Sequence, residues 1–255
     1  FEERQKEEFF KFNKGEIINY PTAEKLEGEA KEKLPKLYLT ITDVNNKVVR
    51  RISSNKSKGF HEIYWDLRTY SQRNILDENN FSGPLVPPGK YNVHLEKFED
   101  NKIQKLSEVQ KFDVFQIGSK STQEEREILY EFQIKFDKLI SNVNDLVDDI
   151  DEAINHLDGE INKSLNLSSE SDLEKINIKR GEMMDLKMVL TGTRSLNYAD
   201  VFSGSPPSVQ RRLGNMSWEL YNTTSRPTNT HISTYNISKN KYEEVLSDFN
   251  RLNRN

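Results

Sequence analysis

Four histidines and a run of carboxylates are the side chains of this sequence that could serve in catalysis or metal binding. Neither set forms a recognisable site. No two histidines sit at the i, i+4 spacing that puts two metal ligands on one helix face; they are His61, His94, His156 and His231. Paired carboxylates serve hydrolysis or bind cations, but the solvated face of a helix explains the acidic run more simply; it comprises Asp145, Asp148, Asp149, Asp151 and Glu152. The sequence therefore predicts no catalytic, cofactor-binding or metal-binding residue.

Other motifs of enzymes and binding proteins are missing or have a structural explanation. No serine lies in a G-x-S-x-G elbow, and no glycine-rich phosphate loop occurs. Arg211 and Arg212 follow a predicted helix start, where an anion could bind, although a structural pair is the simpler interpretation. Among the aromatic residues, Trp65 is expected in the core. Tyr70, in a predicted loop, is the candidate ligand contact because its ring could line a sugar-binding surface.

Composition restricts the class of protein. The chain has 255 residues, 34% hydrophobic and 31% charged, and its mean hydropathy of −0.81 favours several thin layers over one thick core. The lack of cysteine excludes disulfides, thiolate zinc sites and cysteine nucleophiles. The net charge of −4 argues against nucleic acid as a partner, and no run of about 18 apolar residues exists to span a membrane. Because the chain begins with Phe1 rather than methionine, we expect a fragment of a longer protein.

A run from Ser121 to about Lys163 organises the chain. Apolar residues recur there at steps of three and four, which predicts a seam along one side of an α-helix; they are Leu129, Phe132, Phe136, Leu139, Val143, Leu146, Ile150, Ala153, Leu157 and Ile161. Ser121 followed by Glu124 is a capping box that would fix the start. A helix of about 40 residues would run roughly 60 Å, so later segments must cover the seam. Coiled-coil dimerisation is the competing interpretation.

Before this helix the hydrophobic period changes to two, which indicates strands. Strands are expected over 37–42, 48–52, 59–68, 91–98 and 111–116, with a turn at 43–46 and a long loop over 69–82. Asp43 and Asn45 resemble the start of a calcium loop, but Val48 and Ser54 occupy the positions where an EF-hand needs glycine and glutamate. Short alternating strands favour a small antiparallel β-sandwich over 35–118, after a charged, partly helical linker over 1–34.

After the long helix, one-sided apolar stripes predict three shorter helices. The first would start with Ser171 as its cap and stop at Gly192. The next would begin with Ser205 as N-cap and Pro206 at the first helical position, and the last would follow a cap at or near Thr228. Together with the long helix they favour an up-and-down α-helical bundle over 119–255. The predicted fold class is therefore α+β, in three parts.

Two segments before the long helix fit one sequence pattern. Residues 59–66 read GFHEIYWD and residues 86–93 read VPPGKYNV. They resemble the pattern G-x-H-x-V-x-W-D, a variable loop, then V-x-x-G-x-Y, of the Ig-like module first described in the flagellar hook-capping protein. The resemblance implies an Ig-like antiparallel β-sandwich in which four residues are a structural signature: Trp65, Asp66, Gly89 and Tyr91. Leu67-Arg68 takes the place of the glycine that usually follows Trp-Asp. This departure restricts the resemblance to a smaller group of proteins that contain the module.

That variant, with the long helix behind it, is similar to the C-terminal region of bacterial sortilin-like β-propeller proteins, usually called BNR-repeat glycosyl hydrolases. Residues 206–212 read PPSVQRR and residues 224–228 read TSRPT, two stretches that fit that region in order. The resemblance implies a non-catalytic accessory region of an exported protein, extracellular or in the cell envelope, with any hydrolase site in a propeller before Phe1. Its partners would be that propeller, another envelope protein or a glycan. The alternatives are a carbohydrate-binding or glycoside-hydrolase-associated region and a homo-oligomerising helical scaffold.

Overall fold

The computed structural model describes residues 2–18, 20–31, 35–55, 57–70, 82–99, 102–118, 120–167, 170–192 and 207–254. The chain divides into two compact units, and each is discontinuous in sequence. The first, here the strand unit, comprises Phe1–Trp65 and Tyr91–Phe112, and the second, here the helical unit, comprises Asp66–Lys90 and Asp113–Asn255. The mixed α+β class agrees with the prediction. The segment 66–90 packs with the helices, whereas the predicted range 35–118 placed it with the strands.

Two short helices precede the sheet, α1 (Glu2–Asn13) and α2 (Ala23–Lys31). An arginine fork joins them, because Arg4 Nε and Nη2 donate to the Glu29 carboxylate at 2.7 Å each, while Nη1 donates to Glu8 Oε1 at 2.7 Å. These helices leave aromatic side chains exposed, namely Phe9, Phe10 and Phe12. Both helices lie within the range 1–34, for which the sequence predicts a charged, partly helical linker.

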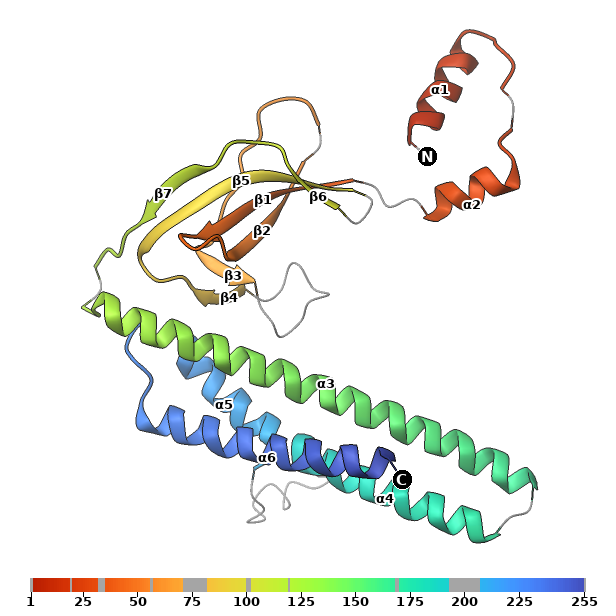
Figure 1. The fold of residues 1–255 in the computed structure, drawn as a ribbon, viewed down its shortest axis with the longest axis vertical. Helices are drawn as coiled ribbons and strands as arrows, with labels where there is room; N and C mark the ends of the chain where they lie inside the picture. Colours follow the sequence, from red (N-terminus) through yellow and green to blue (C-terminus); the bar gives the residue numbers. More distant parts are fainter. Residues whose placement is uncertain are drawn as a thin grey trace, which may run out of the picture. The chain divides into compact units, whose positions relative to one another are not determined.

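A five-stranded sheet forms most of the strand unit (Figure 1). Its strands are β1 (Lys36–Asp43), β2 (Val48–Ser54), β5 (Gly89–Glu99), β6 (Lys102–Lys105) and β7 (Gln110–Val114), in the order β2-β1-β5-β6, with β7 also paired to β5. β1 is antiparallel to β2 and β5, and β5 is antiparallel to β6. Strands were predicted at all of these places except β6, whose exposed side chains show no alternation in burial.

The turn between β1 and β2 explains the calcium-like spacing. Asp43 Oδ1 accepts hydrogen bonds from the backbone N–H groups of Asn45 at 2.8 Å and Lys47 at 2.9 Å. Asn46 has a positive φ of 61°, which asparagine tolerates better than most residues. The carboxylate therefore holds a hairpin turn, as predicted.

The predicted strand over 59–68 is wrong. Residues 59–67 form no ladder, and pairing starts only at β3 (Arg68–Tyr70), which is antiparallel to β4 (Ser82–Leu85). Leu67 has a φ of 58°, and Asp66 Oδ1 accepts a hydrogen bond from Arg68 N at 3.0 Å, so a turn interrupts the strand. The predicted loop over 69–82 begins and ends in these two strands, and residues 71–81 lie outside the described residues.

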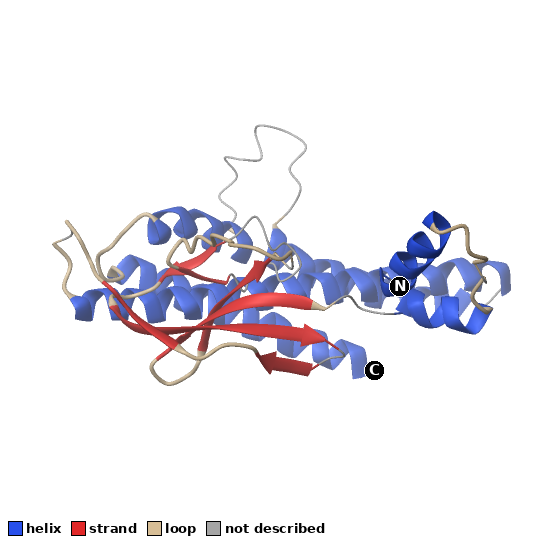
Figure 2. Cartoon of the chain, turned by 90° about the horizontal axis from the view of Figure 1, so that it is seen from above, coloured by secondary structure: helices blue, strands red, loops and turns tan. Residues whose placement is uncertain are grey.

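Four helices in the described part of the helical unit pack around one hydrophobic cluster (Figure 1; Figure 2). They are α3 (Gln123–Leu167), α4 (Glu170–Thr191), α5 (Val209–Tyr221) and α6 (Asn229–Arg254). α3 contacts the other three, and most of its predicted seam is buried in the cluster. The seam is thus covered within one chain, which needs no second copy.

The predicted start of α3 is displaced. The capping box of α3 lies one residue later than predicted, because Glu125 N donates to Thr122 Oγ1 at 3.2 Å and Thr122 N donates to Glu125 Oε2 at 3.0 Å. Ser121 and Glu124 fit the same pattern in sequence, but the Ser121 hydroxyl instead donates to Thr224 Oγ1 at 3.2 Å.

The remaining caps are partly as predicted. α4 begins at Glu170, so Ser171 lies inside the helix rather than at its cap. α5 is capped by Ser208, whose hydroxyl accepts from Arg211 N, and the predicted Ser205 and Pro206 lie outside the described residues. The cap at Thr228 is confirmed by a 3.2 Å bond from His231 N, and Gly192, with φ 86°, ends α4 as predicted.

Replacing Ser208 with alanine should lower the free energy of unfolding of the helical unit by about 1 kcal/mol, because Arg211 N loses its acceptor. Urea unfolding followed by far-ultraviolet circular dichroism measures this. Ser233→Ala is the matched control, since this exposed serine lies inside α6, where alanine is the better helix former. Equal effects of the two substitutions would contradict the capping role.

Candidate functional site: an apolar hollow with a buried arginine

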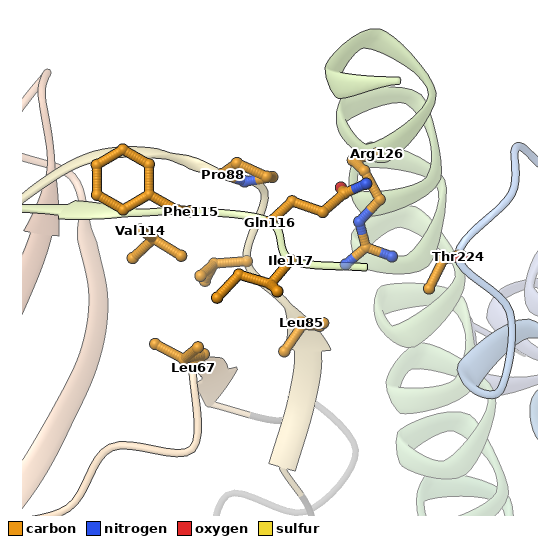
Figure 3. Close-up of a pocket in the computed structure, with 10 residues that line it drawn as sticks. Leu67, Leu85, Pro88, Val114, Phe115, Gln116, Ile117, Arg126 and Thr224 are labelled. Carbon is orange, nitrogen blue, oxygen red and sulfur yellow. The ribbon is translucent and has the colours of Figure 1, made fainter. Parts of the chain in front are cut away.

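A hollow of about 210 Å³ opens in the helical unit, where four segments meet the first turns of α3 (Figure 3). The turn after Asp66 brings Leu67 to the end of β4, and Val86 N donates to Leu67 O at 2.9 Å. The residues after β7 and the loop before α6 complete the wall. The lining comprises Leu67, Leu85, Val86, Pro88, Val114, Phe115, Gln116, Ile117, Arg126 and Thr224.

The walls of the hollow are mostly apolar, and they differ in exposure. Val86 is 3% exposed and forms part of the interior, whereas Phe115 is 77% exposed and Ile117 is 92% exposed. Large apolar side chains are normally distributed singly over a surface, but these two flank an apolar cavity. We call them the rim of the hollow.

Arg126 is the single charged residue among the described residues of the lining. Only 6% of it is exposed, and its guanidinium has no hydrogen-bond or ion-pair partner among the residues that the structure describes. Burial lowers the pKa of Arg126, and the positive charge of Arg68 lowers it further. Since arginine stays protonated in proteins, the hollow contains a buried positive charge without compensation from a carboxylate of the lining.

Neighbouring polar groups hold the hollow in shape. Gln116 Nε2 donates to Ser121 O at 2.8 Å, and this bond ties the segment after β7 to the residues before α3. The nearby carboxylate of Glu125 accepts from Thr122 N and pairs with Arg226 at 3.5 Å. Figure 3 shows Arg126 reaching from α3 toward Ile117. The arrangement can bind an anion whose remainder is apolar.

Comparison with known proteins identifies no relative of this chain. No protein-family model, curated protein or solved structure matches the chain. Within the described ranges, no three histidine, cysteine or carboxylate side chains gather where they could hold a metal ion. None of the helices described there combines the length and the apolar content that a membrane span requires.

None of the four residues of the predicted structural signature is among the residues that line the hollow. In the strand unit, the Trp65 ring packs edge-on against Tyr91 and Phe112, with centroids 5.9 and 6.0 Å apart. Asp66 accepts the hydrogen bond of the turn before β3, and Gly89 is the first residue of β5. Tyr70, the candidate sugar contact, is 50% exposed on β3 and does not line the hollow.

Other groups weighed in the sequence have structural partners. His61 Nε2 lies 2.7 Å from Ser57 O, and Arg212 Nε donates to Pro207 O at 3.1 Å. In the acidic run, Asp151 accepts from Lys187 Nζ at 2.5 Å and so joins α3 to α4. The sequence reasoning missed Arg126, although a signal was present: it lies three residues before Leu129 and therefore on the seam side of α3, where a charge is unusual.

A second buried polar cluster lies on the sheet of the strand unit. The Glu96 carboxylate, in a residue that is 9% exposed, accepts from Thr40 Oγ1 at 2.5 Å and from Arg51 Nε at 3.1 Å, and lies 2.9 Å from His94 Nε2. Thr40 is paired with Arg51 on one side and His94 on the other, so the register brings them together. Because three partners already engage the carboxylate, we interpret the cluster as structural.

The Glu96 cluster makes the stability of the strand unit depend on pH. Burial alone would raise the pKa of Glu96, but hydrogen bonds from Thr40, His94 and Arg51 outweigh burial and lower the pKa below its ordinary value of 4.5. With a lowered folded-state pKa, the carboxylate stabilises the fold above pH 4.5, and this stabilisation is lost as the pH falls through the folded-state value.

Thr40→Val should lower the free energy of unfolding by about 1.5 kcal/mol at neutral pH, because Glu96 loses a hydrogen bond to its charged form. The difference from wild type should shrink in acid, where Glu96 is protonated. Urea titrations at neutral pH and in acid measure the free energy of unfolding of both proteins. Unfolding is followed by Trp65 fluorescence in a Trp218→Phe background. Thr42→Val is the control, since Thr42 is buried on the same strand and takes part in none of the hydrogen bonds to Glu96. A difference that stays constant with pH would contradict the assignment.

Proposed function

We propose that this chain is a non-catalytic docking region that binds a partner protein through the hollow around Arg126. The observation that carries the proposal is the buried, uncompensated guanidinium in an apolar cavity with an exposed apolar rim. Burying a charge without a partner is costly, and an anionic group of a binding partner would offset that cost. Exposed Phe115 and Ile117 would supply apolar contact around it.

The docking role agrees with the resemblance found in the sequence. We propose that the five-stranded sheet belongs to an Ig-like β-sandwich, which the packing of Trp65 on Tyr91 and Phe112 supports. We propose further that α3–α6 form an up-and-down bundle, which their shared core supports. The parent would be an exported sortilin-like propeller protein of the cell envelope or the extracellular space. The partner would be its propeller or another envelope protein.

Site-specific crosslinking tests the docking role. A benzophenone amino acid at position 117, introduced in the cells that produce the protein, should give a heavier adduct on illumination, because Ile117 is 92% exposed beside the hollow. The matched control places the same amino acid at Lys163, an exposed position on α3 far along the helix. Adduct formation at position 117 no greater than at position 163 would overturn the proposal.

Carbohydrate binding is the second candidate, and the half-exposed ring of Tyr70 favours it. Isothermal titration of the chain with oligosaccharides should then give heat that Tyr70→Ala removes, and an absence of heat would count against it. A homo-oligomerising scaffold would need a surface other than the α3 seam, which the same chain covers. A mass by light scattering that rises with concentration would support such a scaffold.

A further inference from the structure

We infer that the hollow binds the free C-terminal carboxylate of a partner chain whose last side chain is apolar. This inference rests on the docking function proposed above and names the chemistry that the partner presents. Of the two proposed partners it takes the separate envelope protein, because a propeller joined to residue 1 would have no free C-terminus. Three observations carry it, namely the charge at the end of the hollow, the size of the cavity and the position of the exposed rim.

The charge selects a carboxylate. Arg126 presents a planar fork of N–H donors that matches the two oxygens of a carboxylate. The ten lining residues include no acidic side chain that could pair with Arg126 in place of a ligand. A phosphate is a poorer fit, because it carries more charge and the lining offers one guanidinium among mainly apolar groups. The neighbouring Arg68 does not line the hollow, and its Nη1 donates to Gly83 O at 3.2 Å. Burying a doubly charged group there would leave oxygens without donors.

The cavity volume selects a single apolar side chain beside the carboxylate. A cavity of about 150 Å³ lined by aliphatic side chains holds a benzene molecule, and this hollow measures about 210 Å³. One ring or branched aliphatic group therefore fits together with a carboxylate. A C-terminal residue carries both groups on one Cα atom, whereas an internal residue would also have to bring the chain in and out of the hollow.

The rim favours a chain over a free small acid. Phe115 and Ile117 remain largely exposed at the border of the cavity, so a small ligand inside it would leave them in water. The residues that precede a partner's C-terminus would cross this rim and bury part of both side chains. Apolar contact outside the hollow would therefore add to the affinity of a peptide.

NMR titration of the whole chain tests the inference with three probes. These are acetyl-Gly-Gly-Phe with a free carboxylate, the same peptide as its C-terminal amide, and phenylacetate. The peptide with the free carboxylate should shift the NMR signals of the Gln116 side chain. The C-terminally amidated peptide should bind at least about tenfold more weakly, because it cannot form an ion pair with Arg126. Phenylacetate should bind more weakly than the free peptide, since it does not reach the rim.

Variants locate the effect. Arg126→Gln should lower the affinity for the peptide with the free carboxylate at least about tenfold. It should leave the affinity for the amidated peptide unchanged. Arg251→Gln, at an exposed arginine of α6 that pairs with Asp248, should leave both affinities as in wild type. Equal binding of acid and amide by the wild-type chain would overturn the inference without recourse to any variant, as would a failure of all three probes to bind at millimolar concentration. Phenylacetate binding as tightly as the peptide would instead assign the site to free acids. If adducts form at position 117 while the peptides fail, docking stands and the carboxylate inference falls.

Discussion

Phe136→Ala is expected to lower the free energy of unfolding of the helical unit by about 3–5 kcal/mol. Phe136 is fully buried in the N-terminal half of the α3 seam, in the cluster that α4, α5 and α6 share. Removing its ring takes away apolar burial and leaves a cavity that rigid neighbouring helices fill only in part. Urea unfolding followed by far-ultraviolet circular dichroism gives the change.

The control for Phe136 is a large-to-alanine substitution on the same unit's surface. Ile178 is 57% exposed on α4, so Ile178→Ala removes little buried area and should change stability by less than about 0.5 kcal/mol. A loss at Phe136 no larger than the loss at Ile178 would show that α3 is not held by the shared cluster, and the coiled-coil interpretation of the seam would then regain its support.

Gly83→Ala is expected to destabilise the helical unit by about 3 kcal/mol, at the upper end of overpacking effects. A Cβ atom at position 83 would lie 2.6 Å from the carbonyl oxygen of Tyr70 and 3.0 Å from that of Thr69, and would also meet the Thr69 hydroxyl. Backbone oxygens cannot swing away as a side chain does. The β3–β4 pairing must therefore open or shift to admit the methyl group.

Gly159→Ala is the matched control for Gly83→Ala, because the same chemical change has the opposite expected sign. Gly159 lies within α3, and a Cβ atom there meets nothing within 4 Å. Alanine is favoured over glycine inside a helix by up to about 1 kcal/mol, so this variant should be slightly more stable than wild type. A loss of stability at both positions would mean that the close approach at Gly83 is not the cause.

The periodic parts of this chain were predictable, and the reason is local. The α3 seam repeats over many turns, so its helix followed from spacing alone, and the alternation in β1 and β5 likewise followed from the pleat of a sheet. The capping box was misplaced by one residue because Ser121–Glu124 and Thr122–Glu125 are equivalent in sequence. Only a contact distant along the chain, from Ser121 to Thr224, distinguishes them.

The candidate site was not predictable in the same way. Its lining comes from four separate stretches, around residues 67, 85–88, 114–117 and 126, with Thr224 in addition. No spacing rule relates residues so far apart in the chain. The strand predicted over 59–68 is wrong for a related reason. Leu67 has a left-handed backbone, which leucine rarely adopts, so the sequence does not predict it. That backbone reversal leads directly into the wall of the hollow.

The two units are interleaved, and this has a consequence for any attempt to separate them. The polypeptide passes between them after Trp65, Lys90 and Phe112, so no single cut releases either unit whole. A fragment starting at residue 119 would retain Arg126 and Thr224 but lose every other residue that surrounds the guanidinium. Truncation would thus turn a buried cation into a solvated one, and transfer of the helical segment alone to another protein would carry Arg126 without the other walls of its hollow.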